Sequence, residues 1–136
     1  MTVEQNITVN NKISDCIFCS IPRDRIILEN ELIYAIRDNY PVTPLHSLII
    51  PKRHVEDYFS LTKDELLSCN ALLKEVKNSI KAEDESVKAF NIGINSGKEA
   101  GQTIFHCHIH LIPRRVGDVE NPRGGIRHLI PGKGDY

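Results

Sequence analysis

The sequence predicts an α+β fold, in which one long helix packs across an antiparallel meander sheet. Short β-branched segments recur between turn residues, one stretch has the apolar spacing of a long helix, and the last apolar segment carries histidines at alternate positions. A chain of 136 residues corresponds to about one domain. We therefore expect all the elements to share one fold.

The first three strands are predicted between residues 25 and 51. The segments "RIILE" (25–29) and "LIYAIRD" (32–38) flank an asparagine-containing turn, which is typical of a β-hairpin. The apolar segment "HSLIIP" (46–51) follows them and is stopped by Pro51, because proline cannot donate a hydrogen bond to a strand ladder. Together these segments predict the first half of the meander.

The predicted helix follows "SLTKDEL" (60–66), where Thr62 and Glu65 have the spacing of a capping box. Apolar residues then recur at helical intervals, at Leu66, Cys69, Leu73, Val76 and Ile80. We expect this stripe to pack on the sheet and the lysines of the other faces to stay exposed.

Two further strands are predicted, "KAFNIGIN" (88–95) and "HCHIHLIP" (106–113), separated by the glycine-containing loop "SGKEAG". From about residue 117 the chain is punctuated by Gly and Pro. Residues 1–14 are polar, and we expect a flexible arm there. The predicted domain therefore spans residues 15–136.

The charge of the chain argues against two classes of partner. Seventeen basic and eighteen acidic residues give a net charge of −1, which does not favour binding to nucleic acid or to a membrane surface. The polar start has no signal-peptide pattern, and no segment approaches the length of a membrane span. We expect a cytoplasmic protein.

The stretch "HCHIHLI" (106–112) places His106, His108 and His110 on one face of a strand, because side chains alternate between faces. The other face is apolar and predicts core packing. The alternative is an exposed strand that happens to be rich in histidine. A row of imidazoles is more typical of acid, base, nucleophilic or metal chemistry.

Cys16 and Cys19 form a CxxC pair, which has the spacing of half a tetrahedral zinc site. A redox pair is the alternative, but the strand and long helix typical of thioredoxin-like sites are missing around it. We expect Cys69 and Cys107 to be core residues without chemistry.

The stretch "NSGKEAGQTIFHCHIHLIPRR" (95–115) resembles the signature of the histidine triad family of nucleotide hydrolases and transferases. The resemblance extends upstream through "CIFCSI", "AIRDNYPVTPLHSLIIPKRH" and the helix. It implies the histidine triad fold, a homodimer with a continuous sheet, and a purine nucleotide or dinucleotide as substrate. The substrate would be cleaved at its α-phosphate through a nucleotidyl-histidine.

The resemblance implies a role for each matching residue. His108 would be the nucleophile, with His110, His46 and Gln102 as further catalytic residues. Backbone N–H groups near Gly97 and Gly101 would approach the phosphate. The substrate-binding set would be Asp38, Asn95, Gly101, Gln102, Thr103, Ile17, Phe18, Ile21 and Ile36, with Asp38 on the ribose and the apolar residues on the base.

Some branches of the family complete a zinc site with two histidines, which here correspond to His54 and His106. A closed Cys₂His₂ shell would be structural, tying the N-terminal turn to the catalytic strand. A divalent cation such as Mg²⁺ is also expected to accompany a polyphosphate substrate.

Branch-specific features point to different substrates. "EAGQT" resembles the fragile histidine triad branch, which favours dinucleoside polyphosphates, whereas "CIFC" resembles bacterial hydrolases and Asn95 resembles the phosphoramidase branch. Leu45 stands where glycine is common. Two other classes stay open: a nucleotide-binding signalling module with little turnover, and a metal enzyme whose ion is held by the histidine row itself.

Overall fold

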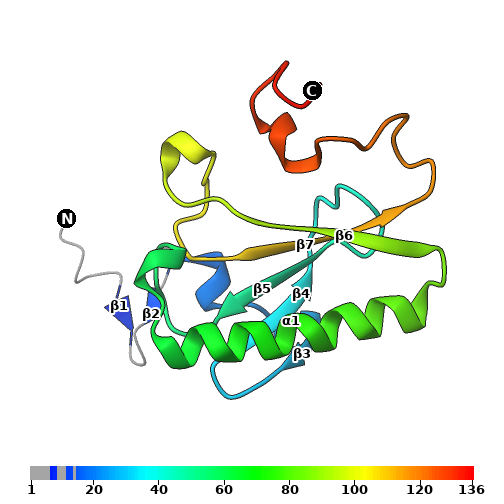
Figure 1. Cartoon of the computed structure of the whole chain (residues 1–136). Helices are drawn as coiled ribbons and strands as arrows, with labels where there is room; N and C mark the ends of the chain where they lie inside the picture. The colour runs from blue at the N-terminus through cyan, green and yellow to red at the C-terminus, as the bar shows by residue number, and fades with distance from the viewer. Residues whose placement is uncertain (1–6, 9–11, 14) are drawn as a thin grey trace.

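The computed structural model describes residues 7–8, 12–13 and 15–136, and it confirms the predicted α+β fold. Five antiparallel strands pair in the order β3-β4-β5-β7-β6, and one helix crosses the sheet (Figure 1). The bounds of these elements are β3 Ile26–Glu29, β4 Ile33–Arg37, β5 Ser47–Pro51, α1 Lys63–Glu83, β6 Val87–Ile94 and β7 Ile109–Arg115.

Helix α1 begins where its capping box predicts. The Thr62 hydroxyl accepts from the Glu65 N–H at 3.1 Å, and the Glu65 carboxylate accepts from the Thr62 N–H at 2.9 Å. The stripe on its inner face is buried at Cys69, Leu72, Val76 and Ile80. These side chains share a core with the apolar face of the sheet, which explains why the helix lies on it.

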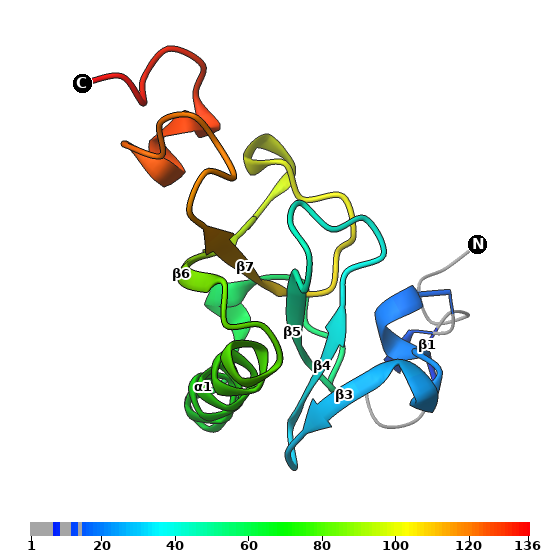
Figure 2. The same cartoon turned by 90° about the vertical axis from the view of Figure 1, so that its right-hand side faces the viewer.

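The opposite face of the sheet carries a second, smaller core made with the short turn η3 (Ile17–Cys19). Phe18 packs there against Ile36 and Leu48, and the Tyr34 hydroxyl donates to the Phe18 carbonyl. Figure 2 shows α1 on one side of the sheet and this N-terminal turn on the other. The turn therefore lies over the face that bears the histidines.

Strand β7 begins at Ile109, three residues later than the start of the predicted strand at His106. The Cys107 N–H donates to the Val55 carbonyl at 2.7 Å instead of to a neighbouring strand. The alternation persists before the strand, since Cys107, Ile109 and Leu111 all belong to the helix-side core. The histidines thus keep the opposite face.

The sheet register brings the segments of the site together. Leu48 of β5 lies opposite His110 of β7, and Gly93 of β6 lies opposite the same histidine from the other side. The residue that precedes β5, His46, therefore falls beside the histidine row.

The N-terminal residues that are described form a small ladder, in which β1 (Ile7–Thr8) pairs with β2 (Lys12–Ile13). The rest of the expected arm lies outside the described residues. The C-terminal tail forms the turn η7 (Gly125–Leu129), which contacts β6. The guanidinium groups of Arg123 and Arg127 lie 4.9 and 4.5 Å from the centre of the Tyr136 ring.

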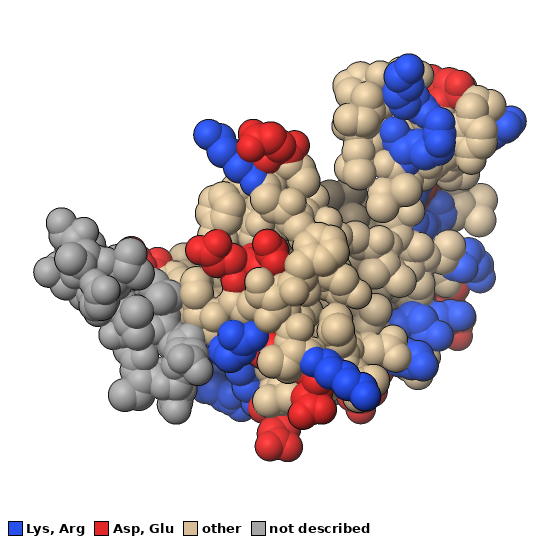
Figure 3. All heavy atoms as spheres, turned by 60° about the vertical axis from the view of Figure 1, so that its left-hand side comes forward, with Lys and Arg blue, Asp and Glu red and all other residues tan. Residues whose placement is uncertain are grey.

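The surface carries acidic and basic side chains interspersed, and Figure 3 shows a hollow between the tail and the rest of the molecule. Within the described ranges, no helix has both the length and the apolar character needed to cross a membrane.

Candidate active site and metal centre

A pocket of about 320 Å³ lies on the histidine face, between the η3 turn and the loops that follow β4 and β6. Ten of its sixteen lining residues are ones that the sequence singled out: Ile17, Phe18, Ile36, Asp38, His46, Asn95, Gly101, Thr103, His108 and His110. Residues from distant segments of the chain therefore converge on one cavity.

Two of the expected residues do not line this pocket. Ile21 packs instead against the smaller core. Gln102 is 4% exposed, and its amide accepts from the Gly97 N–H at 2.8 Å and donates to the carbonyls of Glu56 and Ile104 at 2.7 and 3.1 Å. Its side chain thus holds the loop before the histidines in shape.

The His108 ring is oriented by the backbone carbonyl of His106. Its Nδ1 lies 2.8 Å from the carbonyl oxygen of His106, which can only accept a hydrogen bond, so Nδ1 carries the proton. In the neutral imidazole the lone pair then lies on Nε2. The side chain is 9% exposed and lines the pocket, with the edge of the Phe18 ring against it. This arrangement presents an unprotonated nitrogen to a ligand.

His46 and His110 form a short relay. The Val42 N–H donates to Nδ1 of His46 at 3.0 Å, so the proton of neutral His46 lies on Nε2. That Nε2–H donates to Nδ1 of His110 at 2.9 Å. The remaining proton of His110 therefore lies on its own Nε2, where it can donate to a bound anion.

Both imidazoles of this relay are held neutral. Burial lowers the pKa of His46, against the opposing influence of the Asp38 carboxylate. Burial, with the neighbouring imidazoles of His108 and His46, lowers the pKa of His110 to about 4. The 3.5 Å approach of His46 to Asp38 is therefore a contact between a carboxylate and a neutral ring rather than an ion pair.

The two carboxylate oxygens of Asp38 have different surroundings: one stabilises a turn and the other faces the pocket. Its Oδ1 accepts from the Tyr40 N–H at 2.8 Å, as in an Asx turn. Its Oδ2 faces His46 at the pocket. The turn is therefore compatible with a ligand contact at the second oxygen.

The loop before the histidines has two glycines in conformations that other residues avoid. Gly97 has φ +99° and Gly101 has φ +94°, on either side of the turn η6 (Lys98–Ala100). Leu45 also has a positive φ, of 72°, at the position where the resemblance leads one to expect glycine. Leu45 packs on the helix-side core, and His46 follows directly from this strained position.

Cys16, Cys19, His54 and His106 form a four-residue cluster whose potential ligand atoms all lie within 4.8 Å of one another. Nδ1 of His106 lies 3.4 Å from the Cys16 sulfur and 3.5 Å from the Cys19 sulfur, and Nδ1 of His54 lies 3.3 Å from the Cys19 sulfur. A tetrahedral zinc with ordinary bond lengths would place sulfur and nitrogen ligands about 3.5 Å apart. The cluster therefore has the dimensions of a closed metal site.

The proton positions also fit a metal. Nε2 of His106 donates to the Pro51 carbonyl at 2.8 Å, which leaves the Nδ1 lone pair facing the sulfurs. Burial lowers the pKa of His106 to about 4, so the ring is neutral and ready to act as a ligand. The row of histidines is thus divided, with His106 in this cluster and His108 and His110 at the pocket.

A second group, Asp38, His46 and His110, also has ligand atoms within 4.8 Å of one another. The nitrogen of His46 that faces this group is the one that carries its proton, because Nδ1 already accepts from Val42. A metal would have to displace that proton and the hydrogen bond to His110. The group is built as a hydrogen-bond relay, which weighs against a catalytic ion held by the histidine row.

Several pocket residues carried no recognisable signal in the sequence. Arg25 reaches the pocket from the short turn just before β3 and donates to the Arg37 carbonyl at 3.1 Å. Tyr40, Val42 and Ile104 line it beside residues that were predicted. Only the proximity of Tyr40, Val42 and Ile104 in sequence to Asp38, His46 and Thr103 could have indicated these three residues.

Comparison with known proteins agrees with the fold. The HIT domain model matches residues 21–117. A HIT-like protein of Saccharolobus solfataricus is 36% identical over 106 residues, covering 72% of this chain and 73% of its own length. Adenylylsulfatase HINT3 of Arabidopsis thaliana is 35% identical over 109 residues, covering 77% of this chain and 55% of the plant protein.

Solved structures agree equally well. A hypothetical histidine triad nucleotide-binding protein from Sulfolobus tokodaii superposes with a TM-score of 0.70 at 38% identity, covering 76% of this chain and 71% of that one. A zinc-bound histidine triad family protein from Mycobacterium smegmatis gives 0.69 at 36% identity, covering 76% and 78%.

Fold and site together define the class of small nucleotide-binding proteins of the hydrolase type. Within that class, the chain belongs to the HIT domain family.

Proposed function

We propose that this protein is a nucleotidyl hydrolase or transferase that cleaves dinucleoside polyphosphates or nucleoside phosphoramidates at the α-phosphate and releases a nucleoside monophosphate. The observation that carries the proposal is the orientation of His108, whose Nδ1–H is held by the His106 carbonyl while Nε2 faces the pocket. A neutral imidazole presented in this way is a competent nucleophile near neutral pH.

In the first step, Nε2 of His108 attacks the α-phosphorus, and the bond from phosphorus to the leaving group breaks as the P–Nε2 bond forms. The leaving group departs with the electron pair of the broken bond and, if it is an amine, with one proton from solvent. In the second step, water attacks the phosphorus and the P–Nε2 bond breaks. The ring nitrogen recovers its lone pair, and the proton of water passes to solvent.

The other residues of the pocket would bind and orient the nucleotide. The Nε2–H of His110, fixed by His46, would donate to a phosphate oxygen and stabilise the charge that develops there. Asp38 would accept from the ribose, Asn95 and Thr103 would contact the phosphate, and Phe18 with Ile36 would pack on the base. Gln102 would act by shaping the loop.

We also propose that the Cys/His cluster holds a structural zinc ion. The donor atoms, their spacing and the tautomer of His106 fit zinc, and the related protein from Mycobacterium smegmatis is zinc-bound. The metal would supply no chemistry to the substrate. It would hold the η3 turn, which carries Phe18, against the segment that carries His108.

The relatives support a nucleotide substrate without distinguishing among substrates. The name adenylylsulfatase describes cleavage of an adenylyl conjugate by the plant relative. A homodimer, a cytoplasmic location and a Mg²⁺ ion that accompanies a polyphosphate stay predictions.

The proposal is tested with adenosine 5′-phosphoramidate and diadenosine tetraphosphate as substrates, and hydrolysis is measured as the AMP released. His108→Ala should lower kcat by about a thousandfold or more, because the covalent intermediate cannot form. Cys107→Ala is the matched control, since this neighbour faces the helix-side core.

The second candidate is a nucleotide-binding module with little turnover. It is favoured only by the completeness of the pocket, which would bind a nucleotide whether or not it reacts. AMP binding without turnover of either substrate would select it over the hydrolase.

A further inference from the structure

Arg25 brings a positive charge to the pocket on the histidine face. It ends the short turn η4 (Arg23–Arg25), and it is the sole Lys or Arg among the described residues that line this pocket. Its Nη2 donates to the Arg37 carbonyl at 3.1 Å, and no carboxylate pairs with it within the described ranges. Since a guanidinium carries several N–H donors, most of those of Arg25 are available to a ligand.

The register of the sheet places Arg25 at the opposite end of the pocket from the histidines. Ile26 of β3 lies opposite Ile36 of β4, and Ile36 lies opposite Leu48 of β5. Leu48 in turn lies opposite His110 of β7. Because neighbouring strands are about 4.8 Å apart, Ile26 and His110 are separated by roughly 14 Å. Arg25 directly precedes Ile26, so the pocket extends from the histidine row on β7 to the guanidinium beside β3.

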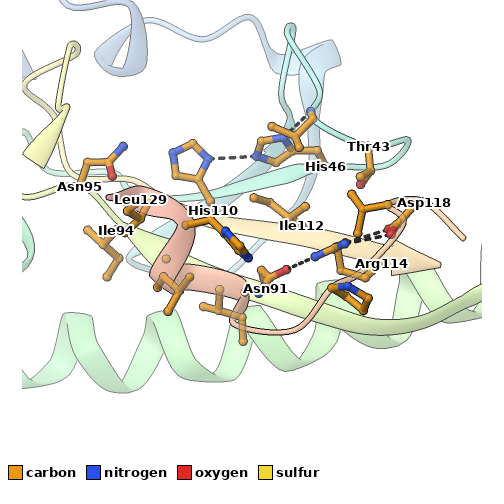
Figure 4. A pocket seen from close by; sticks show the side chains of 18 of the residues that line it. Thr43, His46, Asn91, Ile94, Asn95, His110, Ile112, Arg114, Asp118 and Leu129 are labelled. Carbon is orange, nitrogen blue, oxygen red and sulfur yellow. Dashed lines mark hydrogen bonds and ion pairs between the residues drawn. The ribbon is translucent and has the colours of Figure 1, made fainter. Parts of the chain in front are cut away.

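A nucleotide bound as proposed would lie along this direction. Its phosphate would contact the hydrogen-bonded pair of His46 and His110, which Figure 4 shows close together. Its ribose would contact Asp38, which follows Arg37 directly, and the Arg37 carbonyl is the group that holds Arg25. The base would therefore extend away from the histidines, towards Arg25.

Arg25 also lies near the other wall of the base slot. The Tyr34 hydroxyl donates to the carbonyl of Phe18, the aromatic residue proposed to pack on the base. Burial raises the pKa of this hydroxyl, and the positive charge of Arg25 opposes the rise. The guanidinium thus acts on groups of both walls, which places it at the edge of a base held between them.

The edge of a purine presents different groups to such a guanidinium. Guanine has two neighbouring acceptors, O6 and N7, whereas adenine has the N7 acceptor beside the N6 amino donor. Arginine has donors and no acceptor, and its planar fork matches a pair of acceptors. At adenine, one of these donors would face another donor.

We propose that Arg25 is a specificity-determining residue that recognises the O6 and N7 edge of a 6-oxopurine, so that the protein prefers guanine nucleotides to adenine nucleotides. The inference rests on the proposed function, because it requires that the pocket bind a nucleotide in the direction described. His108 keeps its role at the phosphorus, and Arg25 acts on the base alone.

The test measures dissociation constants of GMP, IMP and AMP by calorimetry, and kcat/KM for guanosine and adenosine 5′-phosphoramidates. The wild type should bind GMP and IMP about tenfold more tightly than AMP, as expected for one bidentate contact to a base. IMP shares O6 and N7 with GMP but lacks the 2-amino group, so it isolates this edge. The 7-deaza analogue of GMP lacks N7 and should bind more weakly than GMP.

Two variants of Arg25 and one control locate the source of the preference. Arg25→Met keeps an apolar stem without donors and should bind GMP and AMP almost equally. Arg25→Lys should retain part of the preference for GMP, because an ammonium can also donate to O6 and N7. Arg23→Met is the matched control, since Arg23 belongs to the same turn, pairs with Glu29 and does not line the pocket. Its preference should equal that of the wild type.

Two results would overturn the inference. One is binding of AMP by the wild type as tight as that of GMP. The other is an Arg25→Met protein that binds both nucleotides with the preference of the wild type. If the wild type bound none of these nucleotides and hydrolysed neither phosphoramidate, the proposed function itself would fail, which distinguishes the two failures.

Discussion

The backbone groups beside the histidines determine where their protons lie. A carbonyl fixes the Nδ1–H of His108, and a backbone N–H fixes the Nε2–H of His46. The carbonyl of Pro51 turns the lone pair of His106 to the cysteines. Alternation in the sequence predicted that three histidines share a face. It could not predict the tautomer of His106, because the Pro51 carbonyl belongs to a distant segment that only the fold brings near.

The depressed pKa of His110 predicts a pH-dependent stability. Its pKa is about 4 in the folded chain against an ordinary value of 6.5, so the unfolded state binds more protons between these values. Stability is therefore fully present above pH 6.5 and is lost as the pH falls towards 4. His110→Asn should remove up to about 2 kcal/mol of this change, after allowance for partial exposure. Urea unfolding between pH 4 and 7 measures this change in the free energy of unfolding. If that free energy depended on pH equally in the wild type and in His110→Asn, His110 would not be its source.

At the scale of elements, local signals predicted the hairpin and α1 well. The capping box at Thr62 and Glu65 lies within one helical turn, so the sequence contains the whole motif. The start of β7 was predicted too early, because the Cys107 N–H pairs with Val55, more than fifty residues away. The hydrogen bond from the Gln102 amide to the Glu56 carbonyl could not be predicted either, because the two residues are distant in sequence.

The cap of α1 predicts a measurable loss of stability. Thr62→Ala removes the hydroxyl that accepts from the Glu65 N–H, and the free energy of unfolding should fall by about 1 kcal/mol. Ser79→Ala is the control, because Ser79 is exposed within the helix and should change stability by less than about 0.5 kcal/mol. Equal effects of the two changes in urea unfolding would show that the cap contributes nothing.

The Cys/His cluster makes a separate prediction. Cys16→Ser should lower bound zinc and the melting temperature together, because the metal joins segments that are distant in sequence. Cys69→Ala should keep its zinc, since Cys69 is buried on α1 and burial raises the pKa of its thiol to about 11. Elemental analysis and thermal unfolding on the same samples check this. Normal zinc in Cys16→Ser would exclude the site.

At the scale of the whole molecule, the resemblance predicted the pocket residues more completely than the surroundings of the pocket. Ile36, the loop and the histidines lie within residues 21–117, which match the HIT domain, whereas Ile17 and Phe18 of the base slot lie before this range and the tail lies after it. The tail approaches β6 only through tertiary contacts, and its Gly-rich composition carries no sign of them.

The expected homodimer belongs to this scale. Sedimentation equilibrium should give a mass of twice 15.4 kDa at micromolar concentration. A monomer that keeps full activity would show that the site is complete within one chain.

The central claim is that a nucleotidyl-histidine forms at His108. The most direct test is to mix the protein with adenosine 5′-phosphoramidate, quench the reaction rapidly without acid, and measure the mass of the intact protein. The account predicts an added adenylyl group that maps to His108 and is absent from His108→Ala. Release of AMP by the wild type with no adduct at any time, or an adduct on another residue, would contradict it.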